Sequence, residues 1–542
     1  MVLAQILSRT PSTSALLLVI LPVTALAYLY AIPAGFLGDD FPLIETASRT
    51  SVLGAFGERI DVYYRPIVWA SFAFEYVLWG ANAAGFHVGN LILHLVNTAL
   101  ATLIARRILK EGWAVALVGV YFGLTPTHAG TVVWLFARTD LLCATFYFAT
   151  ILTFLIYLEG PSLKAGVSVV LLTALALLCK EMALSLPLVA AVVAFAKASG
   201  GSGERLRRCV VFSIPVILAT GVYLVGRYAL VDGLPRSPMH EHWTLTKVAV
   251  NVARYGATLV VPFSLEEIKP FLRANPSILL VASVVGCLVG IAGIVGLRKQ
   301  KAALPVVLCT AMAIFPVVRL FAPWYLYIPS LGVALLIGLI ASGIPEGFRS
   351  RLWVRGAAVA LLLLHLVGLF QFQDAVRTSG RFIISCVEGL GKGLNQGDVG
   401  AVVAVPTEYK SIPAFGWIYN LRFGLAVLGY SVDAIPLTGV RVSDTETSVV
   451  TTVRADGTLH LEIPEGESFF RLPAMAVTQG ALRPGLGERV QTEDATLVVA
   501  AVNDGGFPTA LTIEPASFSL ADPKVRVYTW AEDRLEEIDL RR

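Results

Sequence analysis

Residues 15–33 read ALLLVILPVTALAYLYAIP, and Gly38-Asp39-Asp40-Phe41-Pro42 follows them closely. A helix this long and this apolar can cross a hydrocarbon core about 30 Å thick. Large aromatic residues follow it instead of a small-residue cleavage site, so we interpret it as a retained span and not as a signal peptide. Two adjacent carboxylates at a membrane edge cost free energy unless they are solvated or used. Asp39 and Asp40 are therefore candidates for a functional site.

The composition of the whole chain is that of a polytopic membrane protein. Of its 542 residues, 56% are hydrophobic and only 15% are charged, and the mean hydropathy is +0.72. The net charge of +4 is unevenly divided: residues 374–542 carry 15 Lys and Arg against 22 Asp and Glu, and the rest carries 27 against 16. The basic excess lies in short loops between apolar segments. It therefore reflects membrane topology, and we expect no nucleic-acid partner.

Loops rich in Lys and Arg face the cytoplasm, and this rule orients the apolar segments. The basic clusters are Arg106-Arg107 with Lys110, the run 197–208, Arg298-Lys299-Lys301, and Arg349, Arg351 and Arg355. With a cytoplasmic N-terminus, they predict about eleven spans and a C-terminus on the outside. The predicted spans are 13–33, 86–105, 112–126, 139–158, 165–180, 182–197, 209–229, 277–297, 303–319, 325–342 and 355–372.

The segment 248–263 is apolar enough to span the membrane, but Arg254 and Pro262 interrupt it. As a full crossing it would place two basic clusters outside. We interpret it as a re-entrant or interfacial helix, with twelve spans as the alternative. Two long loops then face the outside, at 34–85 and 229–276, and the first has the pattern of amphipathic helices that lie along the membrane.

Beyond Asp374 the pattern changes to short β-branched segments separated by Asp-Gly, Pro and Gly turns. This pattern predicts a β-rich (α+β) domain with a helix at about 417–428. We therefore expect a transmembrane domain at 1–373 and a soluble extracytoplasmic domain at 374–542. The six cysteines lack metal-ligand spacing, and His240-Glu241-His242 lacks a third spaced ligand, so we expect no metal at either.

Several motifs fall on the predicted outer side. Tyr63-Tyr64-Arg65-Pro66 follows the Asp-Asp pair, and the second span opens as Phe86-His87-x-x-Asn90-x-x-x-His94-x-x-Asn97. This ordered set resembles the outer-face signature of the GT-C glycosyltransferases. More narrowly, it resembles the transmembrane O-mannosyltransferases with tetratricopeptide repeats and the protein O-mannosyltransferases. Three further stretches agree, namely Ala137–Leu142 (ARTDLL), Cys179–Leu184 (CKEMAL) and Trp324–Ser330 (WYLYIPS).

The resemblance implies a polyprenyl-phosphate sugar donor and Asp39 as the base, with Asp40 orienting it or binding a divalent metal. The family usually has Glu-Arg where this chain has Pro323 and Trp324, so Arg319 is the candidate replacement for the missing cation. No tetratricopeptide array occurs in this sequence. The implied donor and phosphate contacts are Tyr64, Arg65, Arg138, Lys180 and Arg319, and the implied groove residues are His87, Asn90, His94, Asp140, Glu181, Tyr325 and Tyr327.

The chemistry also follows from the residue types. Transfer of a sugar from a polyprenyl phosphate to a hydroxyl needs a base for the acceptor proton, cations for the departing phosphate and a water-poor groove for the lipid. An Asp at the membrane surface supplies the base, and an arginine engages two phosphate oxygens at once. Direct displacement needs one carboxylate and inverts the anomeric centre, unlike the two-carboxylate arrangement of hydrolases.

A purely structural role is open to each candidate residue as well. Asp39 or Asp40 can cap a loop helix, and Arg65 can anchor the chain at the membrane interface. The corresponding structural roles are packing for His87 and His94, an ion pair for Arg138 and Asp140, a turn fixed by Lys180 and Glu181, and an interfacial belt for Tyr325 and Tyr327.

We therefore predict an integral membrane glycosyltransferase of a prokaryotic plasma membrane. It would move a sugar, most readily mannose, to a hydroxyl of a protein or polysaccharide on the extracytoplasmic side. Two different functions stay open: a transporter or lipid flippase, and a catalytically silent GT-C-like scaffold whose tail binds a partner. A transporter would favour internal repeats and charges deep in its spans, whereas this sequence has no evident repeat and its charges gather at the outer boundary.

Overall fold

The computed structural model describes residues 11–58, 63–231, 244–260, 297–298, 300–344, 347, 352–409, 412–413, 415, 420–442, 449–463, 469, 485–491, 494–503, 508–531 and 534–538. They form two compact units, which we call the helical unit and the mixed unit. The helical unit takes its residues from Met1–Ile32, Leu53–Ala70 and His87–Gln373, and the mixed unit from Pro33–Val52, Ser71–Phe86 and Asp374–Arg542.

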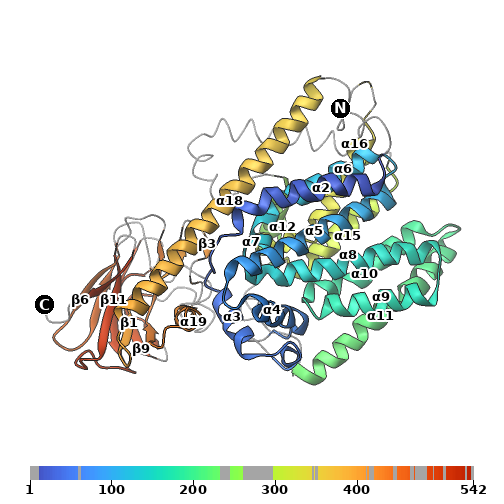
Figure 1. Cartoon of the computed structure of the whole chain (residues 1–542). Helices are drawn as coiled ribbons and strands as arrows, with labels where there is room; N and C mark the ends of the chain where they lie inside the picture. The colour runs from blue at the N-terminus through green and yellow to red at the C-terminus, as the bar shows by residue number, and fades with distance from the viewer. Residues whose placement is uncertain are drawn as a thin grey trace. The chain divides into compact units, whose positions relative to one another are not determined.

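The helical unit consists of apolar helices that run side by side, coloured blue to yellow in Figure 1. Its helices are α2 (Thr13–Tyr28), α5 (Ala83–Ile108), α6 (Gly112–Leu124), α7 (Ala129–Val133), α8 (Arg138–Glu159), α9 (Leu163–Leu177), α10 (Leu186–Lys197), α11 (Ser202–Val231), α12 (Leu245–Val260), α15 (Ala303–Ile314), α16 (Ser330–Ser342) and the first part of α18 (Leu352–Gly393). Short 3-10 turns join several of them, including η5 (Glu181–Ser185), η7 (Phe315–Val317) and η8 (Pro323–Leu326).

Five helices of the described chain are long and apolar enough to cross a membrane. They are Thr13–Ala31, Ala83–Ile108, Leu135–Glu159, Ser202–Ala229 and Val359–Gly393. Every predicted span that the structure describes is helical, whereas all of 277–297 except Leu297 lies outside the described residues. The prediction of a mostly helical chain is confirmed, and the number of spans stays a prediction.

Helix α6 packs closely on its neighbours through two small residues spaced as Gly-x-x-x-Gly, a spacing that lets membrane helices approach each other. A Cβ placed on Gly119 would lie 2.6 Å from Thr102 Oγ1 of α5. A Cβ on Gly123 would lie 2.3 Å from Thr24 Oγ1 of α2. The two glycines therefore set the distance of α6 from both helices.

The segment predicted as a re-entrant or interfacial helix forms α12. Its buried residues Asn251, Tyr255 and Leu259 recur every four positions, and most of the others are half-buried or exposed. Asn251 Nδ2 donates to the carbonyl oxygens of Val318 and Arg319 at 3.0 and 3.1 Å. One face of α12 thus covers the turn after α15, and its depth in a membrane stays a prediction.

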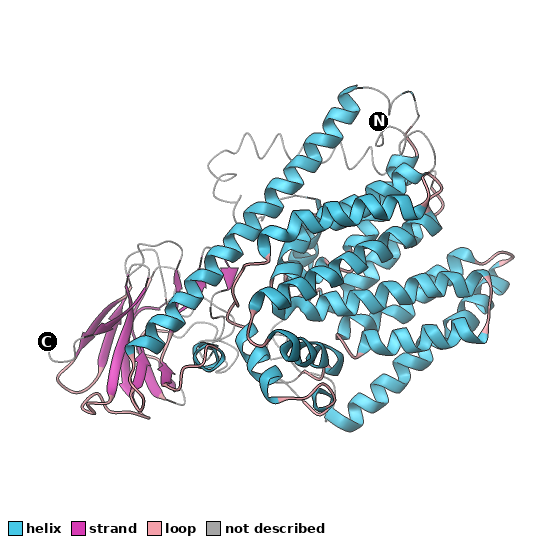
Figure 2. Cartoon of the chain, viewed as in Figure 1, coloured by secondary structure: helices cyan, strands magenta, loops and turns pink. Residues whose placement is uncertain are grey.

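The mixed unit contains all the strands of the described residues, drawn in magenta in Figure 2. A four-stranded sheet has the order β12-β11-β1-β4, with β1 parallel to both of its neighbours; a five-stranded antiparallel sheet has the order β6-β7-β10-β9-β8; and a third sheet has the order β3-β2-β5. The strands are β1 (Val399–Val402), β2 (Val405–Tyr409), β3 (Ile412–Pro413), β4 (Asp433–Pro436), β5 (Gly439–Val442), β6 (Val450–Val453), β7 (Leu459–Glu462), β8 (Arg489–Gln491), β9 (Ala495–Val502), β10 (Pro508–Pro515), β11 (Val525–Ala531) and β12 (Arg534–Ile538).

Helices of the mixed unit come from both ends of the chain. They are α3 (Asp40–Arg49), most of α4 (Pro66–Trp79), α19 (Asn420–Val427) and the last part of α18. The predicted helix at about 417–428 therefore exists, and helices occur in the predicted loop 34–85. In the sequence, α19 falls between β1 and β4, which pair in parallel. A parallel pair needs a crossover connection between its strands, and α19 forms part of that connection.

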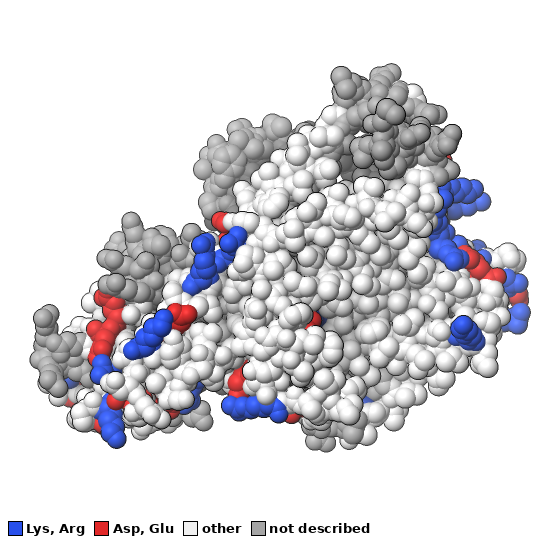
Figure 3. Space-filling view, viewed as in Figure 1, with Lys and Arg blue, Asp and Glu red and all other residues white. Residues whose placement is uncertain are grey.

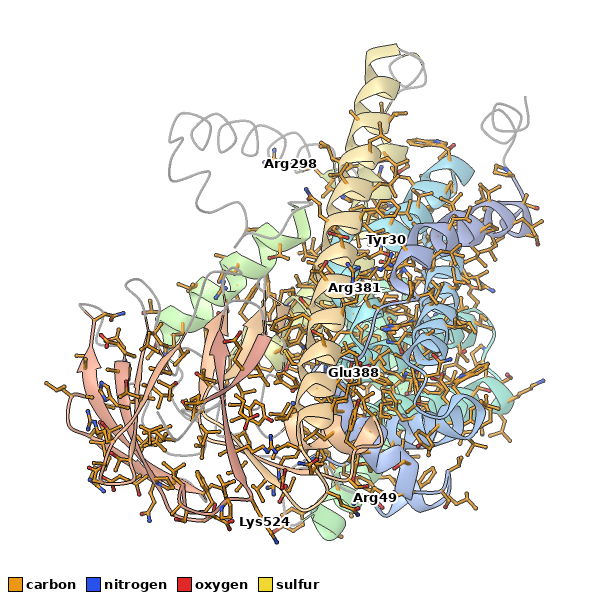
Figure 4. All side chains as sticks on the ribbon, turned by 60° about the vertical axis from the view of Figure 1, so that its left-hand side comes forward. Tyr30, Arg49, Arg298, Arg381, Glu388 and Lys524 are labelled. Carbon is orange, nitrogen blue, oxygen red and sulfur yellow. The ribbon has the colours of Figure 1, made fainter. Side chains whose placement is uncertain are left out.

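Within the last segment of the mixed unit, Asp374–Arg542, the first strand begins at Val399. Helix α18 continues to Gly393 because buried residues still recur at helical spacing, at Ile383, Val387 and Leu390. Figure 4 labels two other side chains on this part of the helix, Arg381 and Glu388. Helix α18 thus runs through residue 374, where the helical unit ends and the last segment of the mixed unit begins.

We expect Gly123→Ala to lower the free energy of unfolding by about 1–3 kcal/mol, because the added methyl forces Thr24 or α2 to move. Gly221→Ala in α11 is the matched control, since its Cβ meets no described atom within 4 Å. The control should be neutral or stabilising by about 0.5–1 kcal/mol. Thermal unfolding of the purified variants in one detergent measures both, and equal destabilisation would contradict the packing of α6.

Candidate active site

The two adjacent carboxylates of the mixed unit have different surroundings. Asp39 precedes α3 in the N-cap position, but its side chain accepts no capping hydrogen bond from the described helix. Asp39 Oδ1 instead accepts a hydrogen bond from Asn420 Nδ2 of α19 at 2.8 Å. Asp40 is 1% exposed, and its Oδ2 accepts from the Leu37 backbone N–H at 2.9 Å. Asp40 therefore fixes the turn before α3, and Asp39 is the more accessible carboxylate.

Asn420 is held in place on two sides. Its Nδ2 also donates to the carbonyl oxygen of Phe415 at 2.6 Å, and the residue is 3% exposed. Helix α19 packs on α3 through Gly424, whose Cβ would touch the Phe41 ring at 3.5 Å. The amide that faces Asp39 thus has little freedom to turn away.

Burial raises the pKa of Asp39 from 3.8 to about 6, and the hydrogen bond from Asn420 opposes that rise. Removal of a carboxyl group from water disfavours its charged form, whereas a donor to the carboxylate favours it. A carboxylate with a pKa near 6 holds a proton better than an ordinary Asp and is still ionised at neutral pH. These are the properties of a general base.

A second group of ionisable side chains lies in the helical unit, and we call it the charged cluster. Arg65 Nη2 lies 2.7 Å from Glu181 Oε2, and Arg227 Nη2 lies 3.7 Å from Glu181 Oε1. Lys180 Nζ lies 2.5 Å from Asp140 Oδ2. Three cations thus meet two carboxylates, and all five side chains are at most 22% exposed.

Aromatic rings cover two cations of the charged cluster. Lys180 Nζ lies 4.6 Å from the centre of the Tyr325 ring, and Arg65 Cζ lies 4.2 Å from the centre of the Tyr63 ring. Cation–π contacts of this kind are stronger when the cation is desolvated. They hold the cations in place while leaving donor hydrogens for other acceptors.

Arg138 has a structural setting inside the bundle. It is fully buried, and its Nε donates to Asn90 Oδ1 at 2.7 Å, while Asn90 Nδ2 donates to the Val132 carbonyl at 3.1 Å. The structure pairs Asp140 with Lys180. Asp140 therefore forms its ion pair with Lys180, in the turn after α9, and not with Arg138 as the sequence suggested.

His94 and Tyr327 belong to a buried hydrogen-bond network. His94 Nε2–H donates to the Gly123 carbonyl at 3.0 Å, and Nδ1 accepts from the Tyr327 hydroxyl at 2.7 Å. Asn97 Nδ2 donates to the same hydroxyl at 3.3 Å. His128 Nε2 donates to Ser330 Oγ at 2.7 Å beside them. Both ring nitrogens of His94 are thus engaged inside the protein, as a packing histidine would be.

The remaining candidates lie apart from this network. Tyr64 donates its hydroxyl hydrogen to the Phe56 carbonyl at 3.2 Å, which ties down the turn at Gly54–Phe56. His87 is buried, and the Arg319 side chain is exposed. His240-Glu241-His242 lies outside the described residues. In the described part of the chain, no group of three or more His, Cys, Asp and Glu is placed to hold a metal ion.

Two residues of these sites were not predicted from the sequence. Arg227 is 3% exposed within the apolar helix α11 and contacts Glu181. A lone arginine inside an apolar segment is itself a signal of function, so Arg227 could have been found from its sequence context. Asn420 carries no such signal, because only the fold brings it to Asp39.

We expect Asp140→Asn to lower stability by about 3–5 kcal/mol, because it leaves the Lys180 ammonium buried without its carboxylate. Asp433→Asn is the matched control: it breaks an ion pair with Arg422 whose side chains are 42% and 56% exposed. Such pairs contribute about 0–1 kcal/mol. Thermal unfolding in detergent compares the two, and a loss in the control as large as that in Asp140→Asn would contradict a special role for the charged cluster.

No protein-family model matches this chain. Protein O-mannosyl-transferase Tmtc2 of Drosophila melanogaster is 33% identical over 152 residues, which are 27% of this chain and 16% of that protein. Protein O-mannosyl-transferase TMTC3 of Mus musculus is 23% identical over 388 residues, which are 59% of this chain and 41% of that protein. The chain thus spans less than half the length of these curated relatives.

Among solved structures, ArnT from Cupriavidus metallidurans bound to undecaprenyl phosphate matches with a TM-score of 0.46 and 14% sequence identity. The match covers 78% of this chain and 90% of that one. The sequence similarity to protein O-mannosyl-transferases confirms the resemblance that the motifs predict.

Proposed function

We propose that this chain is an integral membrane glycosyltransferase. It transfers a sugar, with mannose as the leading candidate, from a polyprenyl-phosphate donor to a hydroxyl of a protein or polysaccharide. The transfer takes place on the extracytoplasmic side of a prokaryotic plasma membrane. The charged cluster carries this proposal, because its three cations exceed its two carboxylates at a buried position. The names of the similar proteins support mannose as the sugar and a protein hydroxyl as the acceptor.

The charged cluster binds the phosphate of the donor in this proposal. Arg65 and Arg227 present planar guanidinium groups that can each engage two phosphate oxygens. Glu181 contacts both arginines and keeps them in place before the donor arrives. Lys180, held by Asp140, adds a third positive charge for the negative charge that develops on the departing phosphate.

Asp39 is the base of the reaction. The acceptor oxygen attacks the anomeric carbon as its proton passes to the Asp39 carboxylate, and the bond from that carbon to the phosphate oxygen breaks with the electron pair leaving on phosphate. One displacement inverts the anomeric centre. Asp40 positions the turn that carries Asp39 through its bond to the Leu37 N–H, and Asn420 orients the carboxylate.

We expect Asp39→Asn to lower the rate of sugar transfer by about 10²–10⁴-fold, because an amide cannot accept the proton. Transfer of radiolabelled mannose from a polyprenyl-phosphate donor in membranes that contain the variant measures the loss. Asp433→Asn, an exposed site on β4, is the control and should retain activity. Full activity of Asp39→Asn at an unchanged protein level would rule out Asp39 as the base.

We expect the transfer rate to rise with pH through about 6 and then to level off, because Asp39 accepts a proton only in its ionised form. Asn420→Ala removes a donor that favours the carboxylate, so the pKa rises further and the midpoint moves to higher pH. The pH dependence of the rate at saturating donor measures both midpoints. If the natural chain and Asn420→Ala rise at the same pH, Asn420 does not act on Asp39 as proposed.

A further inference from the structure

A cavity of about 290 Å³ lies between five helices of the helical unit and is distinct from the charged cluster. Helices α5, α8, α10, α15 and α16 all contribute to its wall. Most lining side chains are apolar, among them Ile151, Leu155, Val193 and Val306. A cavity with this lining fits a hydrocarbon chain better than it fits a polar solute.

Positive charge marks one end of this cavity. Among the described residues that line the cavity, the charged ones are Arg107, Lys197 and Lys301. This lining contains no Asp or Glu. Arg107 lies at the end of α5, Lys197 at the end of α10 and Lys301 just before α15, so all three sit where helices meet a surface. Glu159 pairs with Arg107, which leaves an excess of two positive charges. Figure 3 shows charged side chains concentrated at one end of the helical unit and a white surface beside them.

The start of α15 adds to this positive field. The helix begins at Ala303, and no side chain of the described residues caps it. The N–H groups of a helix start carry a partial positive charge that favours an anion nearby. The cations and the helix start together form the basic mouth of the cavity, defined by Arg107, Lys197, Lys301 and Ala303.

The cavity runs along the helices away from the basic mouth. On α8 its lining extends from Leu155 to Tyr147, and along α15 from Ala302, just before the helix, to Ala313; these stretches are about 12–16 Å long at 1.5 Å per residue. Asp140 of the charged cluster lies about 10 Å along α8 from Tyr147, at the inner end of the cavity, and about 28 Å from Glu159, which pairs with Arg107 at the basic mouth. No residue of the charged cluster lines the cavity, and the basic mouth lies at the far end of the helices from that cluster.

We propose that this cavity binds an anionic membrane phospholipid, with one acyl chain between the helices and the phosphate at the basic mouth. A neutral lipid fits the apolar part but leaves the cations unmatched, and inorganic phosphate matches the cations but leaves the apolar part unfilled. The three cations belong to clusters that the positive-inside rule places in the cytoplasm, so the lipid comes from the cytoplasmic leaflet. This inference does not depend on the proposed transfer reaction.

Native mass spectrometry of the full chain tests the proposal. The protein is purified in a neutral detergent and titrated with phosphatidylglycerol, with phosphatidylcholine of the same chains, with a polyprenyl phosphate and with inorganic phosphate. We expect phosphatidylglycerol to bind at least about tenfold more tightly than phosphatidylcholine, since two unmatched charges act on it. In thermal unfolding of the same detergent-purified protein, inorganic phosphate alone should leave the melting temperature unchanged.

Two kinds of variant distinguish the contribution of the basic mouth from that of the apolar part of the cavity. The double change Lys197→Gln and Lys301→Gln should remove most of the preference for phosphatidylglycerol. Val193→Phe should weaken the binding of both phospholipids, because the larger side chain fills part of the cavity. The control is Lys110→Gln with Lys164→Gln, which removes the same charge from exposed positions that do not line the cavity. Size-exclusion profiles and melting temperatures without lipid confirm that each variant folds.

Three outcomes would overturn the proposal. Equal binding of the two phospholipids would show that the basic mouth does not select a phosphate headgroup of net negative charge. An equal loss in the control double variant would indicate general surface attraction and not a site. Tighter binding of the polyprenyl phosphate, lost in the Lys197 and Lys301 double variant, would assign the cavity to a different lipid.

Discussion

Buried charge is the constraint on which the helical unit depends. In so apolar a chain, a cation held away from water needs a carboxylate or another hydrogen-bond acceptor close by, or it would favour a conformation that exposes it. Glu181 lies between Arg65 and Arg227, and Asp140 binds Lys180, so a few contacts join the segment before α4 to α8, η5 and α11. These contacts fix the ends of helices whose apolar faces would otherwise allow several registers, because a hydrophobic stripe alone distinguishes poorly between neighbouring positions along a helix.

The two aspartates show how position within a turn assigns different chemistry to identical side chains. Asp40 points back to the Leu37 backbone and becomes part of the fold. Asp39 accepts a hydrogen bond from the Asn420 amide, and burial raises its pKa to about 6. Of two adjacent carboxylates, one is therefore tied to the backbone of its own turn and the other is bound by a side chain distant in the sequence.

Much of this architecture could be predicted from the sequence, because helix formation in an apolar chain is a local property. The predicted spans that the structure describes, α12 and α19 exist, since runs of apolar residues and a period near four are visible in any window of the chain. The continuation of α18 beyond the predicted span 355–372 to Gly393 was not predicted, because the apolar run that marks the span ends before the helix does. Partners across the fold were less accessible: Asp140 pairs with Lys180 and not with the nearby Arg138, and nothing local to Asn420 points to Asp39. Such pairings depend on the packing of helices that no single window contains.

The hydrogen bond from Asn420 to Asp39 joins residues that are 381 positions apart. During synthesis the first span and Asp39 leave the ribosome long before Asn420 exists. A nascent chain, or one cut short within the later helices, therefore carries the carboxylate without the amide that orients it. The order of synthesis thus delays the completed Asp39 environment until the segment that carries Asn420 has emerged and folded.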